Sequence, residues 1–224
     1  MYKALFYKEW IKTKRVIFLS AIILPALIIY TYINTEQMFR LGGHVQTWTN
    51  VILKDMSVLP EIAKWFPLFT GLLLALVQYI PEMTDKRMKL TLHLPLPERK
   101  IVLSMLLYGT VTLLSAYLLM YLILSMELRF YYTTEIIRSM TWLFLPYFCG
   151  GLTAYLLTAW ICLEPVWKQR VFNILTGAGG LYLFYIGAKS GAYTTIISYL
   201  AVLMVAVFCF PFYSTARFKD GVQK

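Results

Sequence analysis

Residues 101–126 read IVLSMLLYGTVTLLSAYLLMYLILSM, a run of 26 positions without Asp, Glu, Lys or Arg. A helix rises about 1.5 Å per residue, so about 20 apolar residues cross the roughly 30 Å hydrocarbon core of a bilayer. Lipid offers the backbone no hydrogen-bond partners, so a continuously apolar segment of this length is expected to be helical. Five other stretches also lack all four charged residue types: 16–35, 65–81, 139–163, 171–188 and 190–216.

The pattern predicts an all-α integral membrane protein, with residues 1–224 forming a single transmembrane domain. Hydrophobic residues make up 59% of the 224 positions and charged residues 14%, against about 45–50% and about 25% in soluble domains. This composition argues against an ordinary cytosolic enzyme, and 17% aromatic residues exclude intrinsic disorder. Six transmembrane helices are expected, at about 16–35, 62–81, 101–126, 139–163, 171–188 and 194–214.

The basic residues predict the orientation of the chain. Fifteen of the 21 Lys and Arg lie in segments 1–15, 82–100, 164–170 and 217–224, and the other six lie in the alternating segments. Basic residues are enriched in cytoplasmic loops, so we expect a multi-pass protein of the inner (cytoplasmic) membrane with both termini in the cytoplasm. The net charge of +10 is then mostly a topology signal. No soluble basic domain is evident, so no nucleic-acid partner is expected.

The first 15 residues, MYKALFYKEWIKTKR, have the pattern of a basic amphipathic helix lying at the cytoplasmic interface. At helical spacing, one face carries apolar side chains and another basic ones: Phe6, Tyr7, Trp10 and Ile11 against Lys8, Lys12 and Arg15. The alternative is a plain positively charged flank with no further role.

The segment 82–100, EMTDKRMKLTLHLPLPERK, is the longest predicted cytoplasmic connection. We expect a short helix here, capped by Thr84 or Asp85 and ended by Pro95, because the residue before a proline is disfavoured in the helical region. The alternative is an unstructured charged turn. Glu82 and Glu164 stand at inner membrane boundaries, where solvated helix ends are expected.

Several chemistries have no residues to perform them. The apolar windows hold no carboxylate, so a proton-driven mechanism has no evident relay. No H-E-x-x-H or G-x-S-x-G motif occurs, and without a Gly-Lys dipeptide there is no phosphate-binding P-loop. The sequence predicts no catalytic residue, no metal ligand and no cofactor in this chain, which is not expected to be an enzyme by itself.

The order of parts, together with segment 82–107 (EMTDKRMKLTLHLPLPERKIVLSMLL) and the run Tyr7–Arg15, resembles the membrane-spanning permease subunits of type-2 ABC exporters. Pro97 departs from this pattern, since a small polar residue is common there, and Met105 stands where Lys is common. The loop after the fifth predicted helix is also shorter than in many members. The positions that fit are Glu82, Leu90, Leu94, Pro95, Arg99, Ile101 and Leu106.

The resemblance implies an exporter driven by a separate ATP-binding subunit, which would hold ATP and Mg. Segment 85–94 would be the coupling helix that docks on that subunit. A second permease chain, identical or related, would complete the transporter. The residues implied in the contact with the ATP-binding subunit are Glu82, Asp85, Lys86, Arg87, Lys89, Leu90, Leu94 and Pro95.

The absence of charge within the windows favours an apolar or amphipathic cargo, because a small ion would meet no compensating group. In the resembled family the path lies between two protomers, and the first, second and fifth helices would line it. Four glycines of the fifth helix would either line this path or pack helices within one chain: Gly177, Gly179, Gly180 and Gly187. The remaining alternatives are a stand-alone channel or ATP-independent transporter, and a membrane enzyme or scaffold.

Overall fold

The computed structural model describes residues 2–53, 61–84, 87–92, 97–187 and 193–219. Within these ranges the chain forms helices joined by turns and contains no strand, which confirms the all-α prediction for the described residues. The helices are α1 (Tyr2–Leu53), α2 (Glu61–Thr84), α3 (Arg87–Leu92), α4 (Glu98–Leu128), α5 (Thr134–Leu163), α6 (Trp167–Tyr182), α7 (Ile197–Phe208) and α8 (Phe210–Lys219).

Five of the six predicted spans are present as long apolar helices. They cover Lys3–Gly43, Ile62–Thr84, Glu98–Leu128, Thr134–Leu163 and, across α7 and α8, Ile197–Lys219. By the length and hydropathy of these helices the chain is a multi-pass membrane protein.

At 171–188 the helix in the structure is shorter than the predicted span. It corresponds to α6, whose 16 residues extend only about 24 Å. The Tyr193 hydroxyl explains where α6 ends, because it donates to the Leu183 carbonyl at 3.1 Å and accepts from the Gly187 N–H at 2.7 Å. A side chain from beyond the helix thereby satisfies backbone groups that another helical turn would have used.

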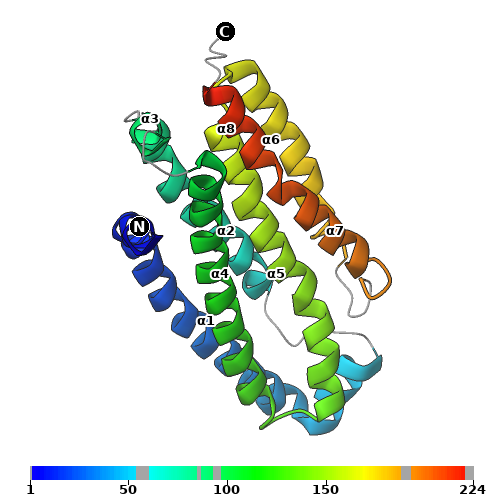
Figure 1. Ribbon diagram of the computed structural model, residues 1–224. Helices are drawn as coiled ribbons and strands as arrows, with labels where there is room; N and C mark the ends of the chain where they lie inside the picture. The colour runs from blue at the N-terminus through cyan, green and yellow to red at the C-terminus, as the bar shows by residue number, and fades with distance from the viewer. Residues whose placement is uncertain (1, 54–60, 85–86, 93–96, 188–192, 220–224) are drawn as a thin grey trace.

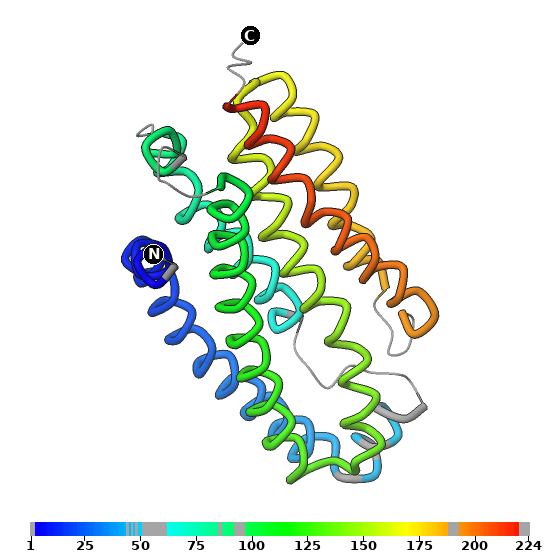
Figure 2. The backbone as a smooth tube through the Cα atoms, in the orientation of Figure 1, coloured from blue at the N-terminus to red at the C-terminus, as the bar shows by residue number. Residues whose placement is uncertain are grey.

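The segments predicted separately at 1–15 and 16–35 form one helix, α1, which continues to Leu53. Figures 1 and 2 show its first turns nearly end-on while the rest runs down the view, so the N-terminal part lies across the bundle. Pro25 stays inside the helix, whereas Gly43 interrupts it with φ 69° and ψ 163°. A positive φ costs glycine little, which explains why the helix changes direction there.

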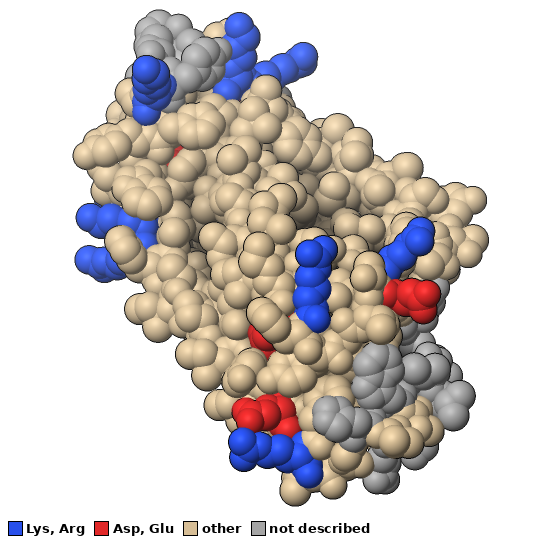
Figure 3. Space-filling view, turned by 90° about the horizontal axis from the view of Figure 1, so that it is seen from below, with Lys and Arg blue, Asp and Glu red and all other residues tan. Residues whose placement is uncertain are grey.

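Helix α5 is the centre of the bundle and packs against α2, α4, α6, α7 and α8. Every residue from Gly150 to Ala159 is buried. The start of α1, α3 and the C-terminal end of α8 lie toward one end of the bundle, and the α4–α5 connection lies at the other (Figure 1). Viewed from that second end, most of the visible surface is uncharged, with Lys and Arg in a few small groups (Figure 3).

Helices α2 and α5 touch through their backbones. A Cβ atom added at Gly71 would lie 2.2 Å from the Gly151 carbonyl oxygen, and one added at Gly151 would lie 2.6 Å from the Pro67 carbonyl oxygen. Small residues allow membrane helices to approach this closely, and the resulting van der Waals contact is a main source of their association. The two glycines therefore set the spacing of the central helix pair.

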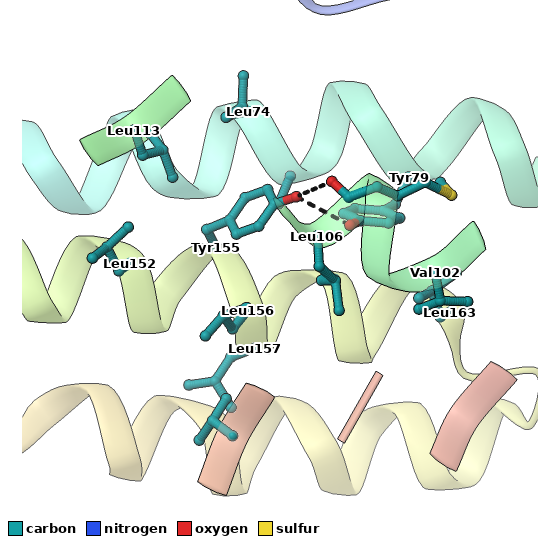
Figure 4. Close-up of a cluster of buried hydrophobic side chains, with 14 of the residues drawn as sticks. Leu74, Tyr79, Val102, Leu106, Leu113, Leu152, Tyr155, Leu156, Leu157 and Leu163 are labelled. Carbon is teal, nitrogen blue, oxygen red and sulfur yellow. Dashed lines mark hydrogen bonds between the residues drawn. The ribbon is translucent and has the colours of Figure 1, made fainter. Parts of the chain in front are cut away.

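A buried polar network joins α2, α4 and α5 beside this contact. Tyr79 and Tyr155 hydroxyls lie 3.0 Å apart, and Tyr155 donates to Gln78 Oε1 at 2.9 Å. Gln78 Nε2 in turn donates to the Met105 carbonyl at 2.9 Å. Figure 4 shows the Tyr155 hydroxyl directed toward Tyr79 among leucine side chains. Gly109 makes room for this ring, since a Cβ there would lie 2.1 Å from the Tyr155 oxygen.

We predict that Gly151→Leu destabilises the fold by about 3 kcal/mol or more, because the added side chain meets backbone that cannot move aside. Gly179→Leu is the matched control, since a Cβ at Gly179 would meet nothing within 4 Å; a change within about 0.5 kcal/mol is expected. Thermal unfolding in mild detergent measures both. Equal stability of the two variants would contradict the central role of the α2–α5 contact.

Candidate functional site

A buried ion cluster lies where α1, α2 and α3 meet. Glu82, in the last turn of α2, has a fully buried side chain. Its Oε1 accepts from the ammonium groups of Lys8 and Lys12, each at 2.9 Å. Thr91 of α3 completes the contact, accepting from Lys8 Nζ at 2.8 Å and lying 3.4 Å from Glu82 Oε2. One carboxylate thus joins three helices.

A second carboxylate balances the two ammonium groups among the described residues of the cluster. Lys12 Nζ lies 2.7 Å from Glu9 Oε2, one turn earlier in α1, and Glu9 is almost fully buried. The cluster therefore holds two carboxylates and two ammonium groups. Buried charges are tolerated only when paired and hydrogen-bonded, and removing one partner leaves an uncompensated charge. Tyr108 of α4 adds a neutral contact, with its hydroxyl 2.7 Å from that of Thr13.

Helix α3 is held to the bundle by one face. Met88 and Thr91, one turn apart, are both buried, and Met88 packs in the hydrophobic core with residues of α2, α4 and α5. The opposite face is exposed at Arg87, Lys89 and Leu90, and the Leu90 side chain is 72% exposed. The short helix predicted in segment 85–94 is present, though Asp85, Lys86, Leu94 and Pro95 lie outside the described residues.

The N-terminal part of α1 is amphipathic, but in a different sense from the prediction. The basic residues Lys8 and Lys12 turn toward Glu82 rather than toward solvent, and only Arg15 of that set is exposed. Leu5, Glu9 and Thr13, spaced four apart, form the buried stripe. All four predicted apolar-face residues are exposed on the outer side: Phe6, Tyr7, Trp10 and Ile11.

The expectation that Glu82 and Glu164 are solvated helix ends was wrong. Glu164, which follows α5, is buried. Its carboxylate contacts Arg217 Nη1 at 3.0 Å and accepts from Ser214 Oγ at 2.7 Å, both in α8. Arg170 of α6 donates to the Glu164 carbonyl at 2.7 Å. Glu164 therefore links α5, α6 and α8 near the end of the bundle where α8 finishes.

The partners of these carboxylates were not found from the sequence. Glu9, Thr13 and Thr91 read as parts of polar flanks, and Tyr108 reads as one aromatic residue in an apolar run. One feature of the sequence could have indicated the pairing. Glu82 directly follows an apolar span, where a carboxylate needs a cation, and the lysine-rich segment 1–15 before the first span can supply one.

The four glycines singled out in the fifth predicted helix have different surroundings. A Cβ added at Gly177 would be in ordinary van der Waals contact with Leu157 and Ile161 of α5, at 3.7–3.8 Å. At Gly179 and Gly180 an added Cβ would meet no atom within 4 Å, so these two do not bring α6 against another described helix. At Gly187 an added Cβ would lie 2.4 Å from a carbon of the Tyr193 ring, so Gly187 is packed tightly against that ring. Their part in a transport path stays a prediction.

An apolar cavity of about 330 Å³ lies between α1, α2 and α4. The described residues that line it include no charged side chain, and its polar atoms come mainly from hydroxyl groups such as those of Ser20, Thr70 and Thr112. In the described part of the chain, no three His, Cys, Asp or Glu residues come together as metal ligands.

No known protein family, curated protein or solved structure matches this chain.

We predict that Glu82→Gln lowers the free energy of unfolding by about 3–5 kcal/mol, the usual effect of removing one partner from a buried ion pair. Glu36→Gln is the control, because Glu36 pairs with an exposed Arg40 and such surface pairs contribute about 0–1 kcal/mol. Thermal unfolding in detergent at fixed pH and salt compares the two. A Glu82→Gln protein as stable as wild type would show that the cluster does not hold the helices together.

Proposed function

We propose that the chain is the permease subunit of a type-2 ABC exporter and that α3 is its coupling helix. The observation that carries the proposal is the division of α3 into two faces. Met88 and Thr91 anchor it in the bundle, while Arg87, Lys89 and Leu90 point outward. A short helix fixed on one side and presenting two basic residues and a leucine on the other is suited to dock in a groove of a second protein.

The Glu82 cluster provides the connection from this surface to the membrane helices. Because Thr91 bonds to both Lys8 and Glu82, and Glu82 pairs with Lys8 and Lys12, a force on α3 acts on the end of α2 and the start of α1 together. Packed elements of this kind move as rigid bodies rather than deforming continuously. Movement of a docked ATP-binding subunit would therefore rock the first two membrane helices as a unit.

The energy for transport would come from that partner, which would bind ATP and Mg, since this chain contains no P-loop motif. In this proposal the short α6 also crosses the membrane, as the fifth of six crossings in chain order. Helix α5 ends at the same end of the bundle as α8 (Figure 1), so α6 must run away from that end before α7 and α8 return to it. Both termini then lie on the cytoplasmic side of the inner membrane.

A second permease chain, identical or related, would complete the transporter, as in the family that the sequence resembles. The exposed strip at Gly179 and Gly180 leaves α6 free to face such a chain. The uncharged cavity between α1, α2 and α4 is compatible with an apolar or amphipathic cargo, because desolvating an ion there would be strongly unfavourable.

We predict that the double reversal Arg87→Glu and Lys89→Glu weakens association with the ATP-binding subunit at least about tenfold, the effect of roughly 1.4 kcal/mol. The residues are exposed, so thermal stability should change little. Arg129→Glu with Arg138→Glu is the charge-matched control, exposed at the opposite end of the bundle. Affinity purification in mild detergent, followed by an ATPase assay of the purified complex, measures the effect.

Full coupled ATPase activity in the α3 double variant would disprove the role of α3. If no ATP-binding protein accompanies even the wild-type chain, an ATP-independent transporter becomes the better description.

We predict that both termini are cytoplasmic, because 15 of the 21 basic residues fall in the segments assigned to that side. Single cysteines at Lys224→Cys and Trp48→Cys test this in a background without Cys149, Cys162 and Cys209. A membrane-impermeant maleimide applied to intact cells should label position 48 and leave position 224 unlabelled until the cells are permeabilised. Labelling of position 224 in intact cells would reverse the assigned orientation.

A further inference from the structure

A groove of about 610 Å³ lies between the start of α4 and α8. Among its lining residues are Arg99 and Val102 of α4, Ala216 and Lys219 of α8, and Cys209 and Phe212 near the start of α8. It is separate from the Glu82 cluster, which involves α1, α2 and α3. Nothing in the proposed transport mechanism uses it.

The groove is charged at one end and apolar at the other. Lys219 stands in the last turn of α8 and Arg99 in the first turn of α4. Cys209 lies ten residues before Lys219, which corresponds to about 15 Å along a helix. Val102 and Phe212 lie between the basic residues at one end and Cys209 at the other. A molecule filling the groove must therefore combine a polar group with an apolar part.

The polar end favours an anion. Lys219 forms an ion pair with Glu98, which offsets the single acidic group in the lining. Arg99 is exposed and forms no ion pair with any residue that the structure describes, so its charge remains uncompensated there. The N-terminal end of α4 carries no side-chain cap, and the acidic residue in its first turn is Glu98, which is already paired with Lys219; helix N-termini attract negative charge.

The position of the groove favours a lipid over a soluble anion. Its two walls belong to helices long and apolar enough to cross the membrane, and neighbouring positions such as Leu103 and Phe210 expose apolar side chains. A free phosphate would fill only the basic end and leave Val102 and Phe212 uncovered. Basic pockets between membrane helices at the cytoplasmic side suit anionic lipid headgroups.

We propose that this groove binds one anionic phospholipid, with its phosphate at Arg99 and Lys219 and an acyl chain along Val102, Phe212 and Cys209. In the proposed orientation of the chain this lipid belongs to the cytoplasmic leaflet, and that placement depends on the proposed function. Binding itself depends on neither the orientation nor an ATP-binding partner, so it can be tested on the full chain alone.

Native mass spectrometry of the full chain, purified in mild detergent with equal amounts of dioleoyl-phosphatidylglycerol and dioleoyl-phosphatidylcholine, measures which lipid is retained. Wild type should retain phosphatidylglycerol about fivefold better, the factor expected for one basic residue at an anionic surface. Arg99→Gln should remove most of this preference by removing charge. Ala216→Trp should remove it by filling the groove. Lys168→Gln, an exposed basic residue on α6, is the matched control and should behave as wild type.

Equal retention of the two lipids by wild type would overturn the proposal. Equal loss of preference in Arg99→Gln and Lys168→Gln would also overturn it, by showing only general attraction to basic residues. Inorganic phosphate that displaced the phosphatidylglycerol would show an anion site instead of a lipid site. If a chain truncated after Lys219 bound phosphatidylglycerol and the full chain did not, the C-terminal segment would be the occupant of the groove in the full chain. If Ala216→Trp fails to fold, Arg99→Gln alone decides the outcome.

Discussion

The backbone contact between α2 and α5 is the constraint on which the other helix positions depend. Because Gly71 and Gly151 lack side chains, the two helices approach until a carbonyl oxygen of one fills the place of a side chain on the other. At that distance Tyr155 of α5 reaches Gln78 of α2, and both reach the Met105 carbonyl of α4. Apolar burial drives helix association weakly in lipid, so close packing and satisfied hydrogen bonds of this kind determine the arrangement.

The central α2–α5 pair also positions the two buried carboxylates at the ends of these helices. Glu82 lies in the last turn of α2 and Glu164 directly follows α5, and each carboxylate is buried and paired with basic residues from other helices. The Glu82 carboxylate gathers α1 and α3. The Glu164 carboxylate binds α8, and the main-chain carbonyl of Glu164 accepts from Arg170 of α6. The two ion clusters thus tie the peripheral helices to the same central pair. In the proposed function, motion entering at α3 would reach α1 and α2 through the first cluster.

The sequence predicted the elements whose cause is local and missed those whose cause is distant. Charge-free windows were enough for α2, α4, α5 and the long apolar part of α1, because any such run must form a helix in lipid. The early end of α6 was missed because Tyr193, beyond the helix, supplies the competing hydrogen bonds. The burial of Glu82 was missed because its partners Lys8 and Lys12 lie 70 or more positions earlier. Amphipathic spacing separated the basic and apolar residues of 1–15 correctly but could not tell which side would find a carboxylate.

The length of α6 has a consequence for the bilayer around the protein. Its 16 residues fall about 6 Å short of a 30 Å hydrocarbon core, while α4 and the central helix α5 are long enough to cross it fully. If α6 crosses the membrane as in the proposed function, the lipids beside it would therefore thin or tilt, at a cost of fractions of a kcal/mol for each ångström of hydrophobic mismatch. The deformation would be confined to the α6 side of the molecule, so a thicker membrane, such as one rich in sterol, would strain the molecule unevenly. A second protein with an equally short helix would share the thinned region and be drawn toward that face.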